Sequence, residues 1–209
     1  MSKPLSEDAL DLLFRGARTH RAWLDKPVSD EMLRRIYDLM KWGPTSQNCC
    51  PARILFLRTR EAKARLLPAL SPGNVKKTTA APVTAVIGYD ALFYERLPRL
   101  FPRTDARAGY VERPEFAEIT ARRNGSLQGA YFMMAARALG LDCGPMSGFD
   151  NAVVDREFFS AGGSGEPGRD CFSDGQVRSN FLCNLGYGDS TKLVPRGPRL
   201  EFDEACRLL

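Results

Sequence analysis

The sequence predicts an α+β fold in a single domain that spans residues 1–209. Apolar residues recur at helical spacing in some segments and form short continuous runs in others. The two kinds of segment do not alternate strictly along the chain, which favours α+β over a parallel α/β sheet. With 44% hydrophobic residues at this length, the chain can bury one sizeable core.

The individual elements follow from these spacings and from the residues that flank them. Ser6 and Ser29 precede apolar stripes as helix N-caps do, whereas Gly43-Pro44 and Gly140 are typical helix stops. Helices are expected over 5–17, from 30 to the stop at Gly43-Pro44, and over 61–70, 115–139 and 150–159, with a short one ending at 209. Strands are expected over 53–58, 83–89 and 181–187.

Two segments fit neither pattern. Residues 91–113 mix prolines, arginines and aromatic residues without a clean period, and we expect a structured excursion or lid there because the aromatic residues favour burial. Residues 160–175 are rich in glycine and predict a flexible surface loop, to which we attach no function.

Residue counts exclude several function classes. His20 is the single histidine, so a Ser–His–Asp hydrolase or a His-ligated zinc enzyme would depend on that one position. The six cysteines form no Cys-x-x-Cys pair, and we expect free thiols and no metal site. Lys and Arg exceed Asp and Glu by 30 − 25 = 5, but the two signs are interleaved, which argues against a nucleic-acid module. No signal-like or membrane-spanning run is visible, so a cytoplasmic protein is expected.

Three loops combine small, polar and glycine residues beside strong secondary structure, at 43–51, 71–77 and 144–149. Glycines in the third loop would let backbone amides approach a planar ligand closely. Each loop alone is also compatible with an ordinary turn or a solvated loop.

Taken with the arginines at 18, 21, 196 and 199, these loops resemble the FMN-dependent nitroreductase family over nearly the whole chain. Ala17-Arg18-Thr19-His20-Arg21 is similar to the basic motif that opens the family. Residues 44–52 are similar to its Pro-Ser-Ser-x-Asn loop, although the family's Gln and Trp are absent. The resemblance implies a nitroreductase-like FMN-binding fold: a central mixed sheet packed by helices, in an intertwined homodimer.

The resemblance also implies which residues contact FMN. Paired guanidiniums suit the phosphate, Asn74 and Lys77 would take the pyrimidine edge of the flavin, and an N–H of Ser147 or Gly148 would face N5, which carries the hydride. No catalytic side chain is therefore expected. The implied cofactor contacts are Arg18, Thr19, Arg21, Pro44, Thr45, Ser46, Asn48, Asn74, Lys77, Pro145, Met146, Ser147, Gly148, Arg196 and Arg199. The loop at 44–48 would serve mainly the flavin of the partner subunit.

The implied activity is an NAD(P)H oxidoreductase with ping-pong kinetics, using NADPH or NADH. Segments such as 140–150 and 186–189 look like the family subgroup that reduces malonic semialdehyde to 3-hydroxypropanoate in pyrimidine degradation. The alternatives are a broad reductase of nitroaromatics, quinones or activated alkenes, and a flavin-binding protein without turnover. Arg103 or Arg107 could bind a substrate carboxylate. His20 is either a catalytic acid or a neighbour of the phosphate corner, and we favour the second.

Overall fold

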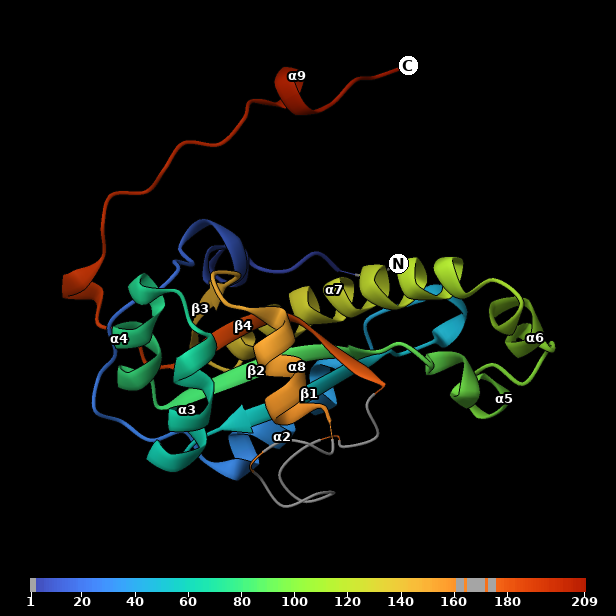
Figure 1. Cartoon of the computed structure of the whole chain (residues 1–209). Coiled ribbons are helices and arrows are strands. Elements are labelled where there is room, and N and C mark those ends of the chain that lie inside the picture. The colour runs from blue at the N-terminus through green and yellow to red at the C-terminus, as the bar shows by residue number, and fades with distance from the viewer. Residues whose placement is uncertain (1–2, 161–163, 165–171, 173–175) are drawn as a thin grey trace.

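The computed structural model describes residues 3–160, 164, 172 and 176–209. Its centre is a sheet in the order β1-β2-β4-β3, in which every strand pair is antiparallel. The strands are β1 (Ala52–Leu57), β2 (Val83–Asp90), β3 (Asp142–Met146) and β4 (Val177–Gly186). Helices cover both faces (Figure 1), which confirms the α+β prediction. The expectation of a mixed sheet was wrong for the described residues, since the only parallel pairing among them is an isolated bridge between Thr19 and Cys143.

Helices and short helical turns make up most of the remaining structure, and several begin at side-chain caps. Ser29 accepts a hydrogen bond from the Met32 N–H at 3.2 Å, and Asp150 accepts one from Val153 at 3.1 Å. The elements are α1 (Glu7–Leu10), η1 (Asp11–Arg15), α2 (Asp30–Met40), η2 (Ser46–Asn48), α3 (Arg60–Leu66), η3 (Leu67–Ala69), α4 (Pro72–Ala80), η4 (Phe93–Arg96), α5 (Leu97–Leu100), α6 (Ala106–Val111), α7 (Pro114–Ala138), α8 (Asn151–Phe158), η5 (Ser190–Lys192) and α9 (Phe202–Ala205).

The core lies on both faces of the sheet because β2 is buried along its whole length. Its side chains alternate between two layers, as a strand requires. Ile87 faces α2 and α7 together with Ile36 and Phe132, whereas Val86 faces α3 and α8 together with Phe158. Long helix α7 therefore backs the sheet on one side, and the other side carries the shorter helices.

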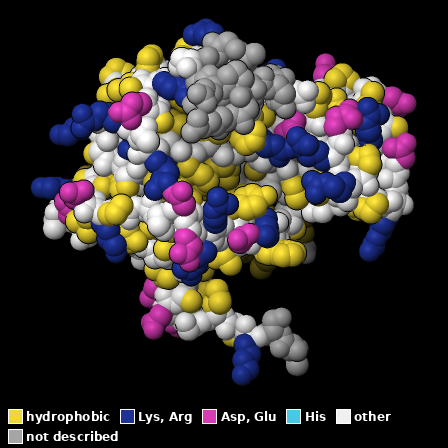
Figure 2. Space-filling view, turned by 90° about the horizontal axis from the view of Figure 1, so that it is seen from below, with side chains coloured by type: hydrophobic (Ala, Val, Ile, Leu, Met, Phe, Trp, Pro, Cys, Tyr) yellow, Lys and Arg dark blue, Asp and Glu magenta, His cyan; other side chains and the backbone are white. Residues whose placement is uncertain are grey.

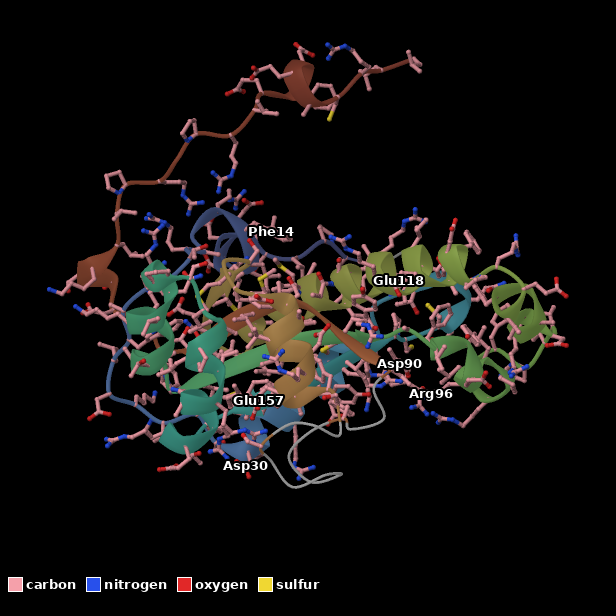
Figure 3. All side chains as sticks on the ribbon, viewed as in Figure 1. Phe14, Asp30, Asp90, Arg96, Glu118 and Glu157 are labelled. Carbon is pink, nitrogen blue, oxygen red and sulfur yellow. The ribbon has the colours of Figure 1, made fainter. Side chains whose placement is uncertain are left out.

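Residues 91–113 form the expected structured excursion, built from η4, α5 and α6 around a small aromatic core that includes Phe93 and Tyr110. The buried carboxylate of Asp90 anchors its start, accepting hydrogen bonds from Arg53 at 2.5 Å and Arg96 at 3.3 Å. Asp90 and Arg96 lie where β2 runs into the excursion (Figure 3).

Several boundaries differ from the predictions. Helix α4 and strand β3 occupy residues expected to be loops, and β4 begins at Val177 rather than at 181. The C-terminal helix is a single turn, within an exposed arm over 193–209 that leaves the body of the protein (Figures 1 and 2). Most of the loop predicted at 160–175 lies outside the described residues.

Within the described part of the chain, no helix is both long and apolar enough to cross a bilayer.

Candidate functional site

A small cavity of about 180 Å³ lies where α4, the end of β3 and the segment before Trp23 come together. It gathers eight of the residues expected to contact FMN, from three distant parts of the sequence. These are Thr19, Arg21, Asn74, Lys77, Pro145, Met146, Ser147 and Gly148; His20, Gly144 and Asn184 complete the lining.

Hydrogen bonds connect α4 to the loop after β3 on one side of this small cavity. Asn74 and Lys77 are three residues apart and so share a face of α4. The Lys77 ammonium donates to Asn74 Oδ1 at 3.1 Å, and the Asn74 amide donates to the Gly148 carbonyl at 2.9 Å. A Cβ on Gly148 would lie 2.8 Å from Asn74 Nδ2. Glycine at 148 is what allows α4 to approach this closely.

The opposite side of the cavity is formed by an extended segment that runs beside β3. The His20 N–H donates to the Cys143 carbonyl at 3.0 Å. A Cβ on Gly144 would lie 2.5 Å from the His20 carbonyl, so a second glycine permits this close contact. Thr19 and Arg21 are exposed on either side of the buried His20.

A second cavity, of about 520 Å³, adjoins the first and is strongly cationic. Arg18, Arg137, Arg196 and Arg199 line it. Their hydrogen-bond partners among the described residues are backbone carbonyls: Arg18 donates to Val194, and Arg196 donates to Arg15 at 2.7 Å and to Ala17 at 2.8 Å. Among the described residues, none of these four arginines forms an ion pair with a carboxylate. Guanidiniums that converge without acidic partners form a site for an anion such as a phosphate.

The two cavities share Thr19 and Arg21. They therefore form one elongated site with a narrow end rich in amide and backbone groups and a wide end rich in positive charge. This arrangement suits a ligand with a hydrogen-bonding ring at one end and a phosphate at the other.

The loop expected to contact the flavin at 44–48 does not line either cavity. It packs instead near α7 and α5: the Ser46 N–H donates to Asn124 at 2.8 Å, and the Asn48 amide donates to the Leu100 carbonyl at 3.0 Å. Gln47, Asn48 and Cys50 all have positive φ, so the loop holds three residues in an unfavourable backbone region. In this chain, Pro44, Thr45, Ser46 and Asn48 lie apart from the residues that line the two cavities.

The two arginines considered for a substrate carboxylate lie in the excursion, outside both cavities. Arg107 already forms a two-pronged ion pair with Glu95, with both N–O distances at 2.8 Å. Arg103 is exposed in the turn between α5 and α6.

The lining residues that were missing from the list of expected contacts include Arg15, His20, Arg137 and Asn184. Arg15 is ion-paired with Glu7 and Asp11. The Nε of Arg137 is buried beside the cationic cavity and has no hydrogen-bond partner among the described residues. Asn184 is buried on β4, where its Oδ1 accepts from Thr84 at 2.7 Å. For Arg137 and Asn184, the only available indication in the sequence was a polar residue inside an otherwise apolar helix or strand.

Comparison with known proteins shows the family of this chain. The profile of the Nitroreductase family matches residues 14–161. A protein of Rhodopseudomonas palustris, provisionally named an NADH dehydrogenase/NAD(P)H nitroreductase, is 53% identical over 209 residues, which are 100% of both chains. Its name does not mention malonic semialdehyde.

Solved structures share the fold at low sequence identity. A provisionally named nitroreductase of Bacillus subtilis has a TM-score of 0.79 at 20% identity and covers 98% of this chain and 100% of its own. Another, from Exiguobacterium sibiricum and solved in complex with FMN, has a TM-score of 0.80 at 18% identity and covers 100% of both chains. The matched profile spans more than half of the chain, and the R. palustris relative matches its full length; this chain belongs to the nitroreductase family.

Proposed function

We propose that the protein is an FMN-dependent oxidoreductase that takes electrons from NADPH or NADH. The observation that carries this proposal is the junction of the cationic cavity and the small polar cavity at Thr19 and Arg21. The FMN-bound relative of the same fold supports the choice of FMN, and the name of the R. palustris relative supports NAD(P)H as the donor.

The residues present fit FMN chemically. Arg18, Arg196 and Arg199 would hold the phosphate, and the buried, unpartnered Nε of Arg137 adds a further donor there. Asn74 and Lys77 would hold the pyrimidine edge, and Lys77 would stabilise negative charge on it. When bound, FMN supplies hydride transfer between NAD(P)H and an oxidised acceptor. The protein's own part is to bind and orient the ring and to keep a cation beside it.

The acceptor we favour is a nitroaromatic, a quinone or an activated alkene, in line with the name of the 53% identical relative. Malonic semialdehyde is the second candidate, because of the resemblance of segments 140–150 and 186–189 to the reductases of that aldehyde. Its carboxylate would need a cation, and Arg103 is more available than Arg107, which is paired with Glu95.

We also propose a homodimer in which the loop at 44–48 completes the partner's site. That loop lies apart from the cavities of its own chain. Strand β1 is an edge of the sheet, beside a groove of about 750 Å³ whose lining includes Arg34 and Arg99. The exposed C-terminal arm carries acidic residues at 201, 203 and 204, which complement this groove in charge. An arm of a second copy in the groove would give the intertwined dimer.

The test begins with the purified protein. Flavin released by heating should be FMN and not FAD, and NADPH or NADH oxidation should depend on an added acceptor. Rates with a nitroaromatic, a quinone and malonic semialdehyde rank the candidates, and Arg103→Ala should raise KM for the aldehyde alone. If the flavin-loaded protein oxidises neither nucleotide with any acceptor, the remaining interpretation is a flavin-binding protein without turnover. Sedimentation of a variant that lacks residues 200–209 tests the role of the arm in the dimer. That variant should be a monomer.

A further inference from the structure

The single histidine is buried between two exposed residues that line the site. His20 has 6% of its surface exposed, whereas Thr19 and Arg21 are exposed. The segment is bonded to β3 through the His20 N–H and through an isolated bridge between Thr19 and Cys143. Burial alternates along it, which places the imidazole on the inner side and Thr19 and Arg21 on the outer side.

The imidazole occupies a closed space between β3 and the loop after β4. Its Nε2 lies 3.4 Å from Asp142 Oδ1, while Asp142 Oδ2 accepts a hydrogen bond from the Gly188 N–H at 2.8 Å. A Cβ on Gly188 would lie 1.9 Å from His20 Nδ1, so only glycine leaves room for the ring. Asp142 therefore connects the histidine segment and the Gly188 loop to the same strand.

The imidazole is placed to hold structure rather than to move protons. Its Nδ1 is buried and has no hydrogen-bond partner among the described residues. The charged groups near the ring are Asp142 on β3 and Asp189 in the loop after β4. The pKa of Asp189 lies below its ordinary value, chiefly because Thr191 donates to it and only to a small extent because of His20.

We propose that His20 is a positioning residue for the phosphate end of the site. Through Asp142 and Gly188 it fixes the peptide that carries Thr19 and Arg21, the two residues shared by both cavities. Because one peptide holds the ring on one side and the two site residues on the other, any shift of the imidazole moves them directly. The proposal rests on FMN as the ligand.

Two substitutions separate this role from general stability. Glutamine places its amide nitrogen where imidazole Nε2 lies, so His20→Gln can keep the contact with Asp142; asparagine reaches only as far as Nδ1, so His20→Asn loses it. Apo-protein is titrated with FMN and with riboflavin, which lacks the phosphate, and flavin fluorescence is measured. His20→Asn should weaken the binding of FMN about tenfold and that of riboflavin less than about twofold. His20→Gln should bind FMN as the wild type does.

Control variants keep the test decisive. Leu33→Ala removes core volume on α2, away from the site, and should lower the melting temperature without changing the FMN-to-riboflavin affinity ratio. Should His20→Asn fail to fold, Asp142→Asn alters a side chain that is 39% exposed and should show the same selective loss. An unchanged affinity ratio in both His20→Asn and Asp142→Asn would overturn the proposal. Wild-type protein that binds no FMN would overturn the proposed function as well.

Discussion

Replacing Gly148 by alanine should damage the flavin end of the site while leaving the fold intact. The new Cβ would lie 2.8 Å from Asn74 Nδ2 and 3.2 Å from Ser71 Oγ, closer than side-chain contacts allow. The buried Asn74 amide must then move, which breaks its 2.9 Å hydrogen bond to the Gly148 carbonyl and disturbs the 3.1 Å bond from Lys77. Losing one such bond and disturbing a second costs about 1–3 kcal/mol. FMN affinity should fall roughly five- to 150-fold if that cost appears in binding.

Gly73→Ala is the matched control, since Gly73 starts the same helix and a Cβ there meets nothing within 4 Å. That variant should bind FMN as the wild type does and gain about 0.4–1 kcal/mol of stability, because alanine restricts the unfolded chain. Fluorescence titration with FMN and urea unfolding measure the two effects. Wild-type FMN affinity in Gly148→Ala would refute the reasoning, because the contact between α4 and the loop after β3 would then not shape the site.

Three further predictions concern charge. Lys77→Ala should lower the flavin midpoint potential by roughly 20–60 mV, and Lys76→Ala, at an exposed neighbour, should leave it unchanged in a redox titration. Asp90→Asn should lower the free energy of urea unfolding by about 3 kcal/mol, because the guanidinium of Arg53, which is 14% exposed, loses its carboxylate partner. A loss below about 1 kcal/mol would contradict this. Burial raises the pKa of the Cys49 thiol to about 11 from 9.0. As the pH rises, the thiol ionises first in the unfolded chain, which favours unfolding. The free energy of unfolding of the wild type, measured in urea, should therefore fall by about 1.4 kcal/mol relative to that of Cys49→Ala between pH 8 and 10.

Two long elements were predictable from the sequence because burial dictates their pattern. The helix expected over 115–139 is α7, where apolar residues recur at helical spacing. The run expected over 83–89 is β2, which is apolar almost throughout because both of its faces are buried.

Helix α4 and strand β3 were missed for opposite local reasons. Helix α4 has few apolar residues, and its strongest indication was Pro72, which suits the first turn of a helix. Strand β3 contains Gly144 and Pro145, both unusual in strands. It is an edge strand of the sheet, where proline is tolerated, and Gly144 is needed for the close approach of the His20 carbonyl.

For the candidate site, sequence indicated residues more than their arrangement. The arginines and the two loops at 71–77 and 144–149 line the two cavities, and their contacts with FMN stay a prediction. Sequence could not show that the Asn74 amide reaches the Gly148 carbonyl, or that the ring of His20 turns toward Asp142, because both depend on contacts between distant segments.

The central claim is that the cationic cavity holds the phosphate of FMN. Titration of apo-protein with FMN and riboflavin, in wild type and Arg18→Ala, tests it most directly, with Arg60→Ala as an exposed arginine control outside both cavities and the groove. The wild type and Arg60→Ala should prefer FMN strongly. Arg18→Ala should lose about 2 kcal/mol, or roughly thirtyfold, in FMN binding while riboflavin binding is unchanged. Equal affinity for FMN and riboflavin in the wild type would contradict the account.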